Sequence, residues 1–167
     1  MAKLELPNGH ALHLVTPAEA ERAAAAEANK AWGRNFLIAR DAKSDLCLLD
    51  IDHGGYCSEH RHWHKFNLFQ VQAGRLLLTL WSDDDGQMSP RAGGGWTMHE
   101  DGDRMCRIVE PGDPPVYLPP RYFHCFEALA PTLAYEFCAC EAPNEIIDPN
   151  DIERRTESGN RFDQTDA

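Results

Sequence analysis

The sequence predicts an all-β domain, a sandwich or a barrel, and three observations support this fold class. After about residue 35, apolar and polar residues alternate with the period of two that is typical of strands. Glycine and proline interrupt this pattern at short intervals, as in domains built from many short strands. The chain has 167 residues, of which 43% are hydrophobic, so it is long enough for one domain with its own core.

The first element that the pattern predicts is a helix over residues 16–31. Thr16 suits the N-cap, Pro17 suits the first helical position, and Glu19 completes a capping box. An alanine-rich run follows, and Gly33 ends it. This helix carries no residues with an evident chemical role.

Short strands are expected after the helix, separated by turns. The expected strands are residues 36–39, 46–51, 56–62, 67–72, 76–81, 96–99, 105–109, 116–118, 123–128 and 132–140. The expected turns and loops are residues 54–55, 74, 82–95, 100–103 and 111–115, which are rich in Gly, Pro, Asp and Ser. The chain thus divides into an N-terminal arm and helix (1–31), a β-barrel (32–143) and an acidic polar tail (144–167), of which 157–167 is expected to be loose.

Composition narrows the possible partners and the compartment. The formal net charge of -11 disfavours nucleic acid and anionic membranes as partners. No run of 18 apolar residues exists, and the N-terminus lacks the apolar core of a signal peptide, so we expect a cytoplasmic protein. The cysteines are then expected to be reduced thiols that pack as small apolar groups. They are Cys47, Cys57, Cys106, Cys125, Cys138 and Cys140.

The histidines carry the strongest functional signal. His60, His62 and His64 occupy alternate positions, so their side chains would share one face of a strand. His124 follows a proline-rich turn much later in the chain. Because neutral imidazole is the commonest metal ligand among side chains, a fold that gathers His60, His62 and His124 would create a metal site.

These residues resemble the two motifs of the cupin superfamily, over roughly residues 32–140. The first motif is matched by Gly54, His60, His62, Asn67 and Gly74, and the second by Gly112, Pro119, Arg121 and His124. The resemblance implies an all-β cupin jelly-roll barrel (a double-stranded β-helix), here with a short N-terminal helix. The flanking residues resemble sugar-related cupins, such as sugar isomerases and the C-terminal domains of sialic acid synthases. These flanks are Trp32 and Gly33, Cys57 and Ser58, and residues 151–154.

The resemblance implies one divalent metal ion per chain, either Fe, Zn, Mn or Ni, bound by His60, His62 and His124. Asn67 stands where the motif has glutamate, so it is either a weak fourth ligand or the sign of a weakened or lost site. Arg121 stands where the motif has glycine, and it either binds a substrate carboxylate or phosphate or points to solvent. Because cupins commonly pair the free edges of the barrel, we expect a homodimer.

Four further residues are candidates for the site. Glu136 is a carboxylate within an apolar strand, so it is either a catalytic base on the inward face or a solvated outward residue. His64 either replaces the missing glutamate, moves a proton instead of Glu136, or is solvated. Tyr122 and Tyr135 could donate hydrogen bonds to a substrate, although aromatic residues in barrels often only pack.

Three functions are compatible with this site. The first is a metal-dependent enzyme acting on a small polar molecule, such as a sugar isomerase or epimerase. The second is a three-histidine Fe(II) dioxygenase, since the loss of the glutamate leaves neutral ligands and open positions. The third is a non-enzymatic cupin that binds a small ligand, for which Asn67 is the main argument.

Overall fold

The computed structural model describes residues 2–5, 11–14, 29–82, 95–100, 102–140, 146, 148 and 150–162, and every regular element among them is a strand. None of the described residues belongs to a helix long and apolar enough to cross a membrane. Most of the helix expected at 16–31 lies outside the described residues, but its predicted end is wrong. Asn29–Lys30 is instead a two-residue strand, β3, paired with the start of the next strand.

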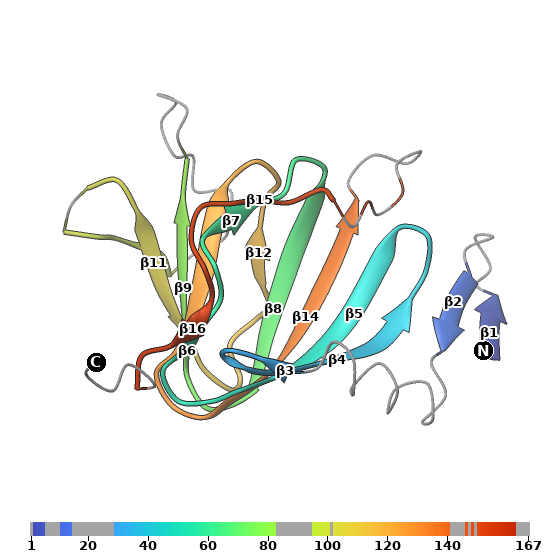
Figure 1. Cartoon of the computed structure of the whole chain (residues 1–167), viewed down its shortest axis with the longest axis horizontal. Coiled ribbons are helices and arrows are strands. Elements are labelled where there is room, and N and C mark those ends of the chain that lie inside the picture. Colours follow the sequence, from blue (N-terminus) through green and yellow to red (C-terminus); the bar gives the residue numbers. More distant parts are fainter. Residues whose placement is uncertain are drawn as a thin grey trace.

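The strands form two sheets that face each other as in a jelly roll (Figure 1). The first sheet has the order β1-β2-β4-β5-β14-β8-β12. Its strands are β1 (Ala2–Glu5), β2 (Ala11–Leu14), β4 (Gly33–Arg40), β5 (Ser44–Ile51), β14 (Thr132–Cys140), β8 (Lys65–Ala73) and β12 (Val116–Leu118). Every pairing in this sheet is antiparallel, which matches the alternating sequence pattern.

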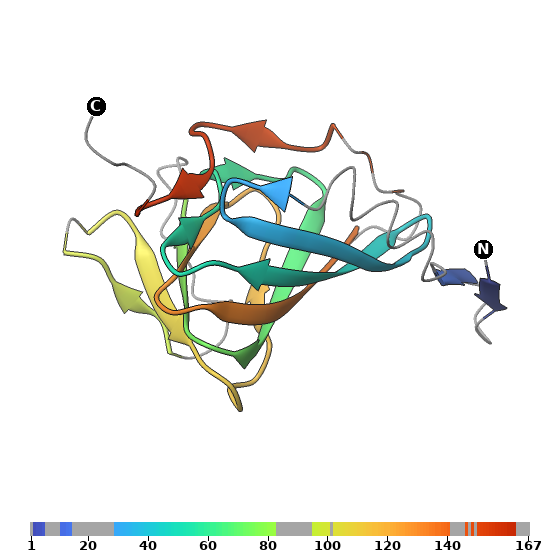
Figure 2. The ribbon, with the colours of Figure 1, turned by 60° about the horizontal axis from the view of Figure 1, so that its bottom comes forward.

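The second sheet has the order β10-β11-β9-β13-β6-β16, and β7 joins β13 to β15. Its strands are β10 (Thr97–Met98), β11 (Met105–Val109), β9 (Leu76–Trp81), β13 (Phe123–Ala128), β6 (Gly55–Tyr56), β16 (Gly159–Asn160), β7 (His60–Arg61) and β15 (Glu153–Arg154). Figure 2 shows the two layers curving around a common interior, with the C-terminal strands crossing one open side.

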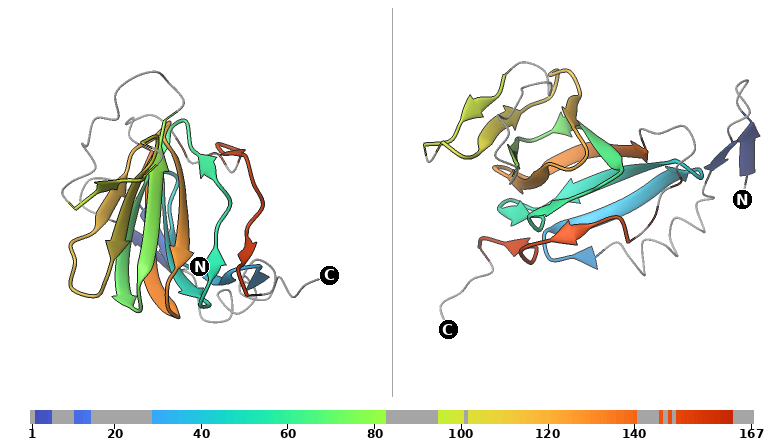
Figure 3. Two further views of the ribbon diagram at one scale, coloured as in Figure 1. Left: turned by 90° about the vertical axis from the view of Figure 1, so that its left-hand side faces the viewer. Right: turned by 90° about the horizontal axis from the view of Figure 1, so that it is seen from above.

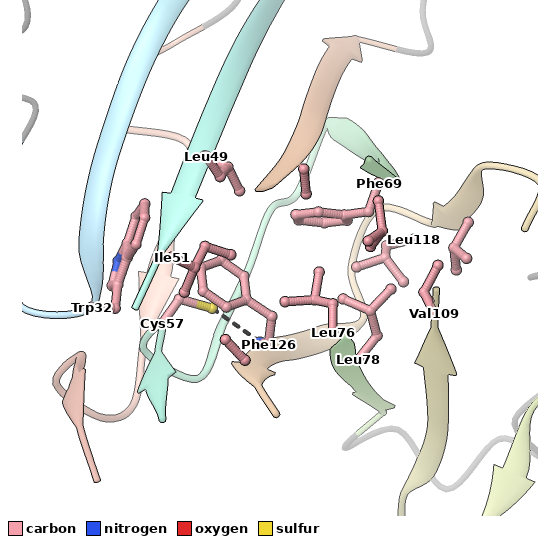
Figure 4. Packing of buried hydrophobic residues seen from close by; sticks show 14 of the residues in the cluster. Trp32, Leu49, Ile51, Cys57, Phe69, Leu76, Leu78, Val109, Leu118 and Phe126 are labelled. Atoms are coloured by element: carbon pink, nitrogen blue, oxygen red, sulfur yellow. Dashed lines mark hydrogen bonds between the residues drawn. The ribbon is translucent and has the colours of Figure 1, made fainter. Parts of the chain in front are cut away.

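The core fills the space between the sheets. Leu76 and Leu78 on β9 are fully buried, and Phe69 and Val71 on β8 and Phe126 on β13 lie in the same cluster (Figure 4). Burying a side chain of this size stabilises the fold by about 2 kcal/mol. Phe69, Val71 and Phe126 are therefore core residues of the barrel.

Two expectations about strands are corrected. The strand expected at 56–62 is two short strands, β6 and β7, separated by irregular residues. Part of the tail is also more regular than expected, because β15 pairs with β7 and β16 pairs with β6, while residues 163–167 lie outside the described residues. We call residues 151–160 the C-terminal strap, which runs along the open side of the barrel in Figure 3.

Candidate metal centre

Three imidazoles meet where β7 and β13 pair. His60 on β7 lies directly opposite His124 on β13 in the sheet register, and His62 follows β7 immediately. The ring centroids are 4.5 Å apart for His60 and His124, 5.1 Å for His60 and His62, and 5.6 Å for His62 and His124. One potential ligand atom from each ring lies within 4.8 Å of the other two. This spacing suits three nitrogen ligands around a single ion.

Backbone carbonyls fix the tautomer of all three rings. Nδ1 of His60 bonds the Ser58 carbonyl at 2.7 Å, and Nδ1 of His62 bonds the Asp151 carbonyl at 2.5 Å. Nδ1 of His124 bonds the Tyr122 carbonyl at 3.2 Å. A carbonyl can only accept, so each Nδ1 carries the proton and each Nε2 carries a lone pair. Metal-binding histidines are commonly held in this way.

The electrostatic environment keeps these imidazoles neutral. Burial lowers the pKa of His62 to about 3 and that of His124 to about 4, and it lowers the pKa of His60 well below its ordinary value. The neighbouring imidazoles lower the pKa of His60 and His62 further. Nε2 of His124 is buried and has no hydrogen-bond partner among the described residues. A buried acceptor without a partner is costly, so this atom fits a metal ion.

Asn67 and Glu136 form a polar pair beside the cluster. Nδ2 of Asn67 donates to Oε1 of Glu136 at 2.5 Å, which leaves Oδ1 of Asn67 buried without a partner in the described structure. An amide oxygen in that position can serve as a neutral oxygen ligand. Burial raises the pKa of Glu136, while the hydrogen bond from Asn67 lowers it. Of the two sequence interpretations, Glu136 thus has the inward orientation.

The cluster opens into a cavity of about 380 Å³ inside the barrel. The size is in the range of small-molecule sites. His60, His62, Asn67 and Glu136 line it, and so does Asn35, whose Oδ1 is a further buried acceptor with no partner in the described part of the chain. The cavity can therefore hold a small polar molecule beside the imidazoles.

The C-terminal strap supports two of the histidines. In addition to its carbonyl, Asp151 accepts hydrogen bonds on its carboxylate from the backbone N–H of Trp63 at 2.9 Å and of His64 at 3.2 Å. Further along, Arg154 donates to Oγ of Ser58 at 2.7 Å, and the Ser58 carbonyl holds His60. The strap therefore contacts the segments on both sides of the His60–His62 pair.

Four predicted site residues do not line the cavity. His64 is exposed, because β7 ends at Arg61 and the strand alternation does not extend to it. Tyr135 points to the outer face of the sheet, since it alternates with Glu136 along β14, and it is 36% exposed. Tyr122 packs against the hydrophobic core, and Arg121 is exposed at a turn with φ of 70°.

Other residues at the site had no clear signal in the sequence. Asn35 and Lys65 both line the cavity, but neither occupies a position of the two motifs. Asp151 lies in a flanking segment whose contact with His62 depends on the fold, because the two residues are far apart in the chain. The only sequence signal for such a residue would have been a polar side chain at an inward position of a strand, as Asn35 is.

Comparison with known proteins gives structural matches only. No protein-family model matches the chain, and no curated protein sequence does. The structure is similar to the capsular polysaccharide assembling protein CapF from Staphylococcus aureus, with 18% identity and a TM-score of 0.54, over 75% of this chain and 30% of CapF. It is also similar to L-ribose isomerase from Geodermatophilus obscurus, with 16% identity and a TM-score of 0.51, over 68% of this chain and 58% of the isomerase.

L-ribose isomerase from Cellulomonas parahominis, without ligand, is a third match, with 19% identity and a TM-score of 0.50, over 72% of this chain and 61% of that enzyme. The chain thus spans about a third of CapF and about three fifths of the isomerases. At these identities the likeness concerns the fold. The expectation of an all-β jelly-roll barrel is confirmed at the level of the fold.

Proposed function

We propose that this protein is a metal-dependent enzyme that acts on a small polar molecule, and that it catalyses a sugar isomerase or epimerase type of reaction. The observation that carries the proposal is the convergence of three imidazoles, each of which bonds a backbone carbonyl through Nδ1 and so leaves Nε2 as the nitrogen with a lone pair. His60, His62 and His124 would hold one divalent ion, and Oδ1 of Asn67 would be a fourth, neutral ligand. The similarity to two L-ribose isomerases supports the choice of reaction class.

A bound divalent ion would polarise a carbonyl or hydroxyl group of the substrate. Glu136 is the residue placed to move the proton. It lines the same cavity, and burial raises its pKa towards the range in which a carboxyl group can both accept and return a proton. Asn67 donates a hydrogen bond to Oε1 of Glu136. The second carboxylate oxygen of Glu136 is therefore the one available to the substrate.

The cysteines bear on the cellular compartment of the protein. All six cysteines are free, and burial raises the pKa of Cys125 to about 11 and that of Cys138 to about 12. Such thiols are poorly reactive, which suits the reducing cytoplasm. We propose a cytoplasmic homodimer that binds a small-molecule substrate.

The test is metal content by mass spectrometry on untagged protein purified without chelator. We expect about one divalent ion per chain, and none in a His62→Ala, His124→Ala double variant. His124→Gln provides a second variant of more similar volume, and circular dichroism verifies that each variant is folded. Aldose–ketose interconversion is then assayed across a panel of pentoses and hexoses. A folded wild-type protein that takes up no ion, even when ions are supplied, would refute the proposal.

One observation favours a second candidate, a three-histidine Fe(II) dioxygenase. The metal-type cluster found among the described residues contains three histidines and no carboxylate, so an ion there would have neutral ligands and open positions. Oxygen consumption by the Fe(II)-loaded protein, with diketones or thiols as substrates, separates this activity from isomerisation. Ligand binding that is equal with and without chelator would instead indicate a non-enzymatic binding protein.

A further inference from the structure

The cavity has an excess of positive charge, although the chain as a whole has a net charge of -11. Arg40 and Asp45 on its wall neutralise each other through hydrogen bonds of 2.7 and 3.0 Å. The other lining residues with a formal charge are three cations and two carboxyl groups. Of these, Arg154 pairs with His60 in the sheet register, and Lys65 lies two residues before Asn67 on β8.

Lys65 begins β8 and lies two residues before Asn67, so both side chains are on the same face of the strand. It lines the cavity together with His60, His62 and Glu136. None of the ion pairs among the described residues involves Lys65. Lys65 is thus a half-buried residue on the cavity wall, and its ammonium group has no carboxylate partner in the described structure.

Arg154 approaches the same imidazoles from the C-terminal strap. It pairs with His60 in the sheet register, donates to Oγ of Ser58, and lines the cavity with His60 and His62. The strap and β8 are different elements, so the two cations reach the imidazoles from separate parts of the fold. Both would repel a divalent cation in the cluster.

The ligand set does not offset this repulsion. The three imidazoles are neutral, and Asn67 provides an amide where a carboxylate would have reduced the charge of the ion. Of the two remaining carboxyl groups on the cavity wall, Glu157 is exposed and Glu136 is hydrogen-bonded to Asn67. When ionised, Glu136 supplies one negative charge against Lys65, Arg154 and the ion. Arg154 is exposed and its charge is partly screened by water, whereas Lys65 is half-buried, and uncompensated charge away from bulk water is costly. An anion that enters with the ion would remove this cost.

We propose that the cavity binds its divalent ion together with a small hydroxycarboxylate, of the sugar acid type, whose carboxylate lies between the ion and Lys65. The inference rests on the proposed metal site and specifies its substrate class. The open positions on an ion with three or four protein ligands allow a carboxylate and a neighbouring hydroxyl to chelate it. Oδ1 of Asn35 would accept a hydrogen bond from a further hydroxyl group, which satisfies its unpaired lone pair.

This arrangement makes the two ligands interdependent. If the anion tightens the binding of the ion by some factor, the ion tightens the binding of the anion by the same factor. A neutral polyol of the same size lacks the carboxylate and would produce no such coupling.

The experiment is a titration of chelator-treated protein with Co(II), followed by its absorption spectrum and by competition with a metal-binding dye. The titration is done alone, with saturating D-glycerate and with glycerol, and is corrected for the complex of glycerate with free Co(II). We expect glycerate to lower the dissociation constant of Co(II) at least about fivefold, within the usual range of coupling between sites. Glycerol should leave it unchanged.

Lys65→Met provides the decisive variant, and Lys30→Met, at an exposed position on the rim of the same cavity, is its matched control. Lys65→Met should bind Co(II) alone as tightly as the wild type or more tightly, because a repulsive charge is removed, and it should lose the effect of glycerate. Lys30→Met should keep that effect. The inference is overturned if glycerate does not tighten Co(II) binding, or if Lys65→Met retains the coupling. Failure of the wild type to bind Co(II) at all would instead refute the metal site itself.

Discussion

Asn67 on β8 and Glu136 on β14 are joined by a hydrogen bond of 2.5 Å between the amide Nδ2 and the carboxyl Oε1. The two strands are neighbours in the sheet, and Glu136 pairs with Phe69, two residues beyond Asn67. A carboxyl group on the adjacent strand thus lies beside Asn67, the position at which the cupin motif has glutamate. Because Glu136 accepts from Nδ2, the amide oxygen of Asn67 is left for another partner.

Two substitutions of Glu136 separate its chemical role from its structural one. Glu136→Gln retains an acceptor for Asn67, so Co(II) affinity should stay within about threefold, whereas turnover should fall by about 10²–10⁴-fold with the loss of the proton-moving group. Glu136→Ala leaves the Asn67 amide unpaired, which costs about 1–3 kcal/mol of stability and should weaken Co(II) binding as well. Steady-state kinetics and Co(II) titration measure the two effects. Full turnover in Glu136→Gln would exclude Glu136 as the base.

The C-terminal strap should control metal affinity through Asp151. Asp151→Ala removes the carboxylate that accepts from the N–H groups of Trp63 and His64, next to His62. We expect a loss of about 10–100-fold in Co(II) affinity, which is the usual effect of removing a group that orients a metal ligand. Glu153 lies in the same strap and provides the control, because Glu153→Ala removes only an ion pair with Arg61. This variant should keep near wild-type affinity for Co(II). Equal affinity in both variants would contradict this role of Asp151.

Acid should destabilise the metal-free protein well before ordinary carboxyl groups titrate. The pKa of His60, His62 and His124 is lowered in the folded state, so their contribution to stability is complete above the unfolded value of about 6.5 and is lost as pH falls towards the folded values. For His62 and His124 those values are about 3 and about 4. Each histidine that is protonated only in the unfolded chain contributes a slope of about 1.4 kcal/mol per pH unit.

Urea unfolding of chelator-treated protein between pH 7 and pH 5 measures this slope. The raised pKa of Glu136 acts in the opposite direction, because its contribution is present at low pH and is lost as pH rises through the folded value. One such group against three histidines leaves a net loss of stability on acidification. His62→Gln should reduce the slope by about 1.4 kcal/mol per pH unit, and an unchanged slope in that variant would argue against a buried neutral His62.

Substitution of Arg121 by glycine should leave the protein more stable than substitution by a β-branched residue. It occupies the left-handed region with φ of 70°, and its backbone N–H donates to the carbonyl of His62 at 2.5 Å. Arg121→Gly relieves this conformation, which costs other residues roughly 1–2 kcal/mol, but it adds freedom to the unfolded chain, so we expect stability equal to the wild type or up to about 1 kcal/mol higher. Arg121→Val should lower stability by about 1–2 kcal/mol. Thermal unfolding distinguishes the two, and equal stability of both variants would contradict the conformational argument.

The strands of the barrel could be predicted because each has a strong local pattern. The bounds expected at Leu76–Trp81, Phe123–Ala128 and Thr132–Cys140 agree with the structure, since alternation and flanking turns define them. The two-residue strands β15 and β16 could not be predicted, because they depend on pairing with distant residues and have almost no periodicity of their own.

The spacing of the histidines in the sequence predicted the cluster of His60, His62 and His124, but it did not predict the environment of these side chains. His64 fits the alternation equally well, and only the end of β7 at Arg61 separates it from His62. The orienting carbonyls of Ser58, Asp151 and Tyr122 are backbone groups, which any side chain at those positions would provide, so no sequence signal could reveal them.

The position of Asp151 also sets an order of events during folding. The hydrogen bonds from the residues 62–64 to Asp151 close loops of 87 to 89 residues, so this part of the site depends on some of the most non-local contacts in the domain. A nascent chain that has completed β14 already contains all three histidines, but His62 still lacks its acceptor. High-affinity metal uptake should therefore be a late step, which reports that the strap has docked.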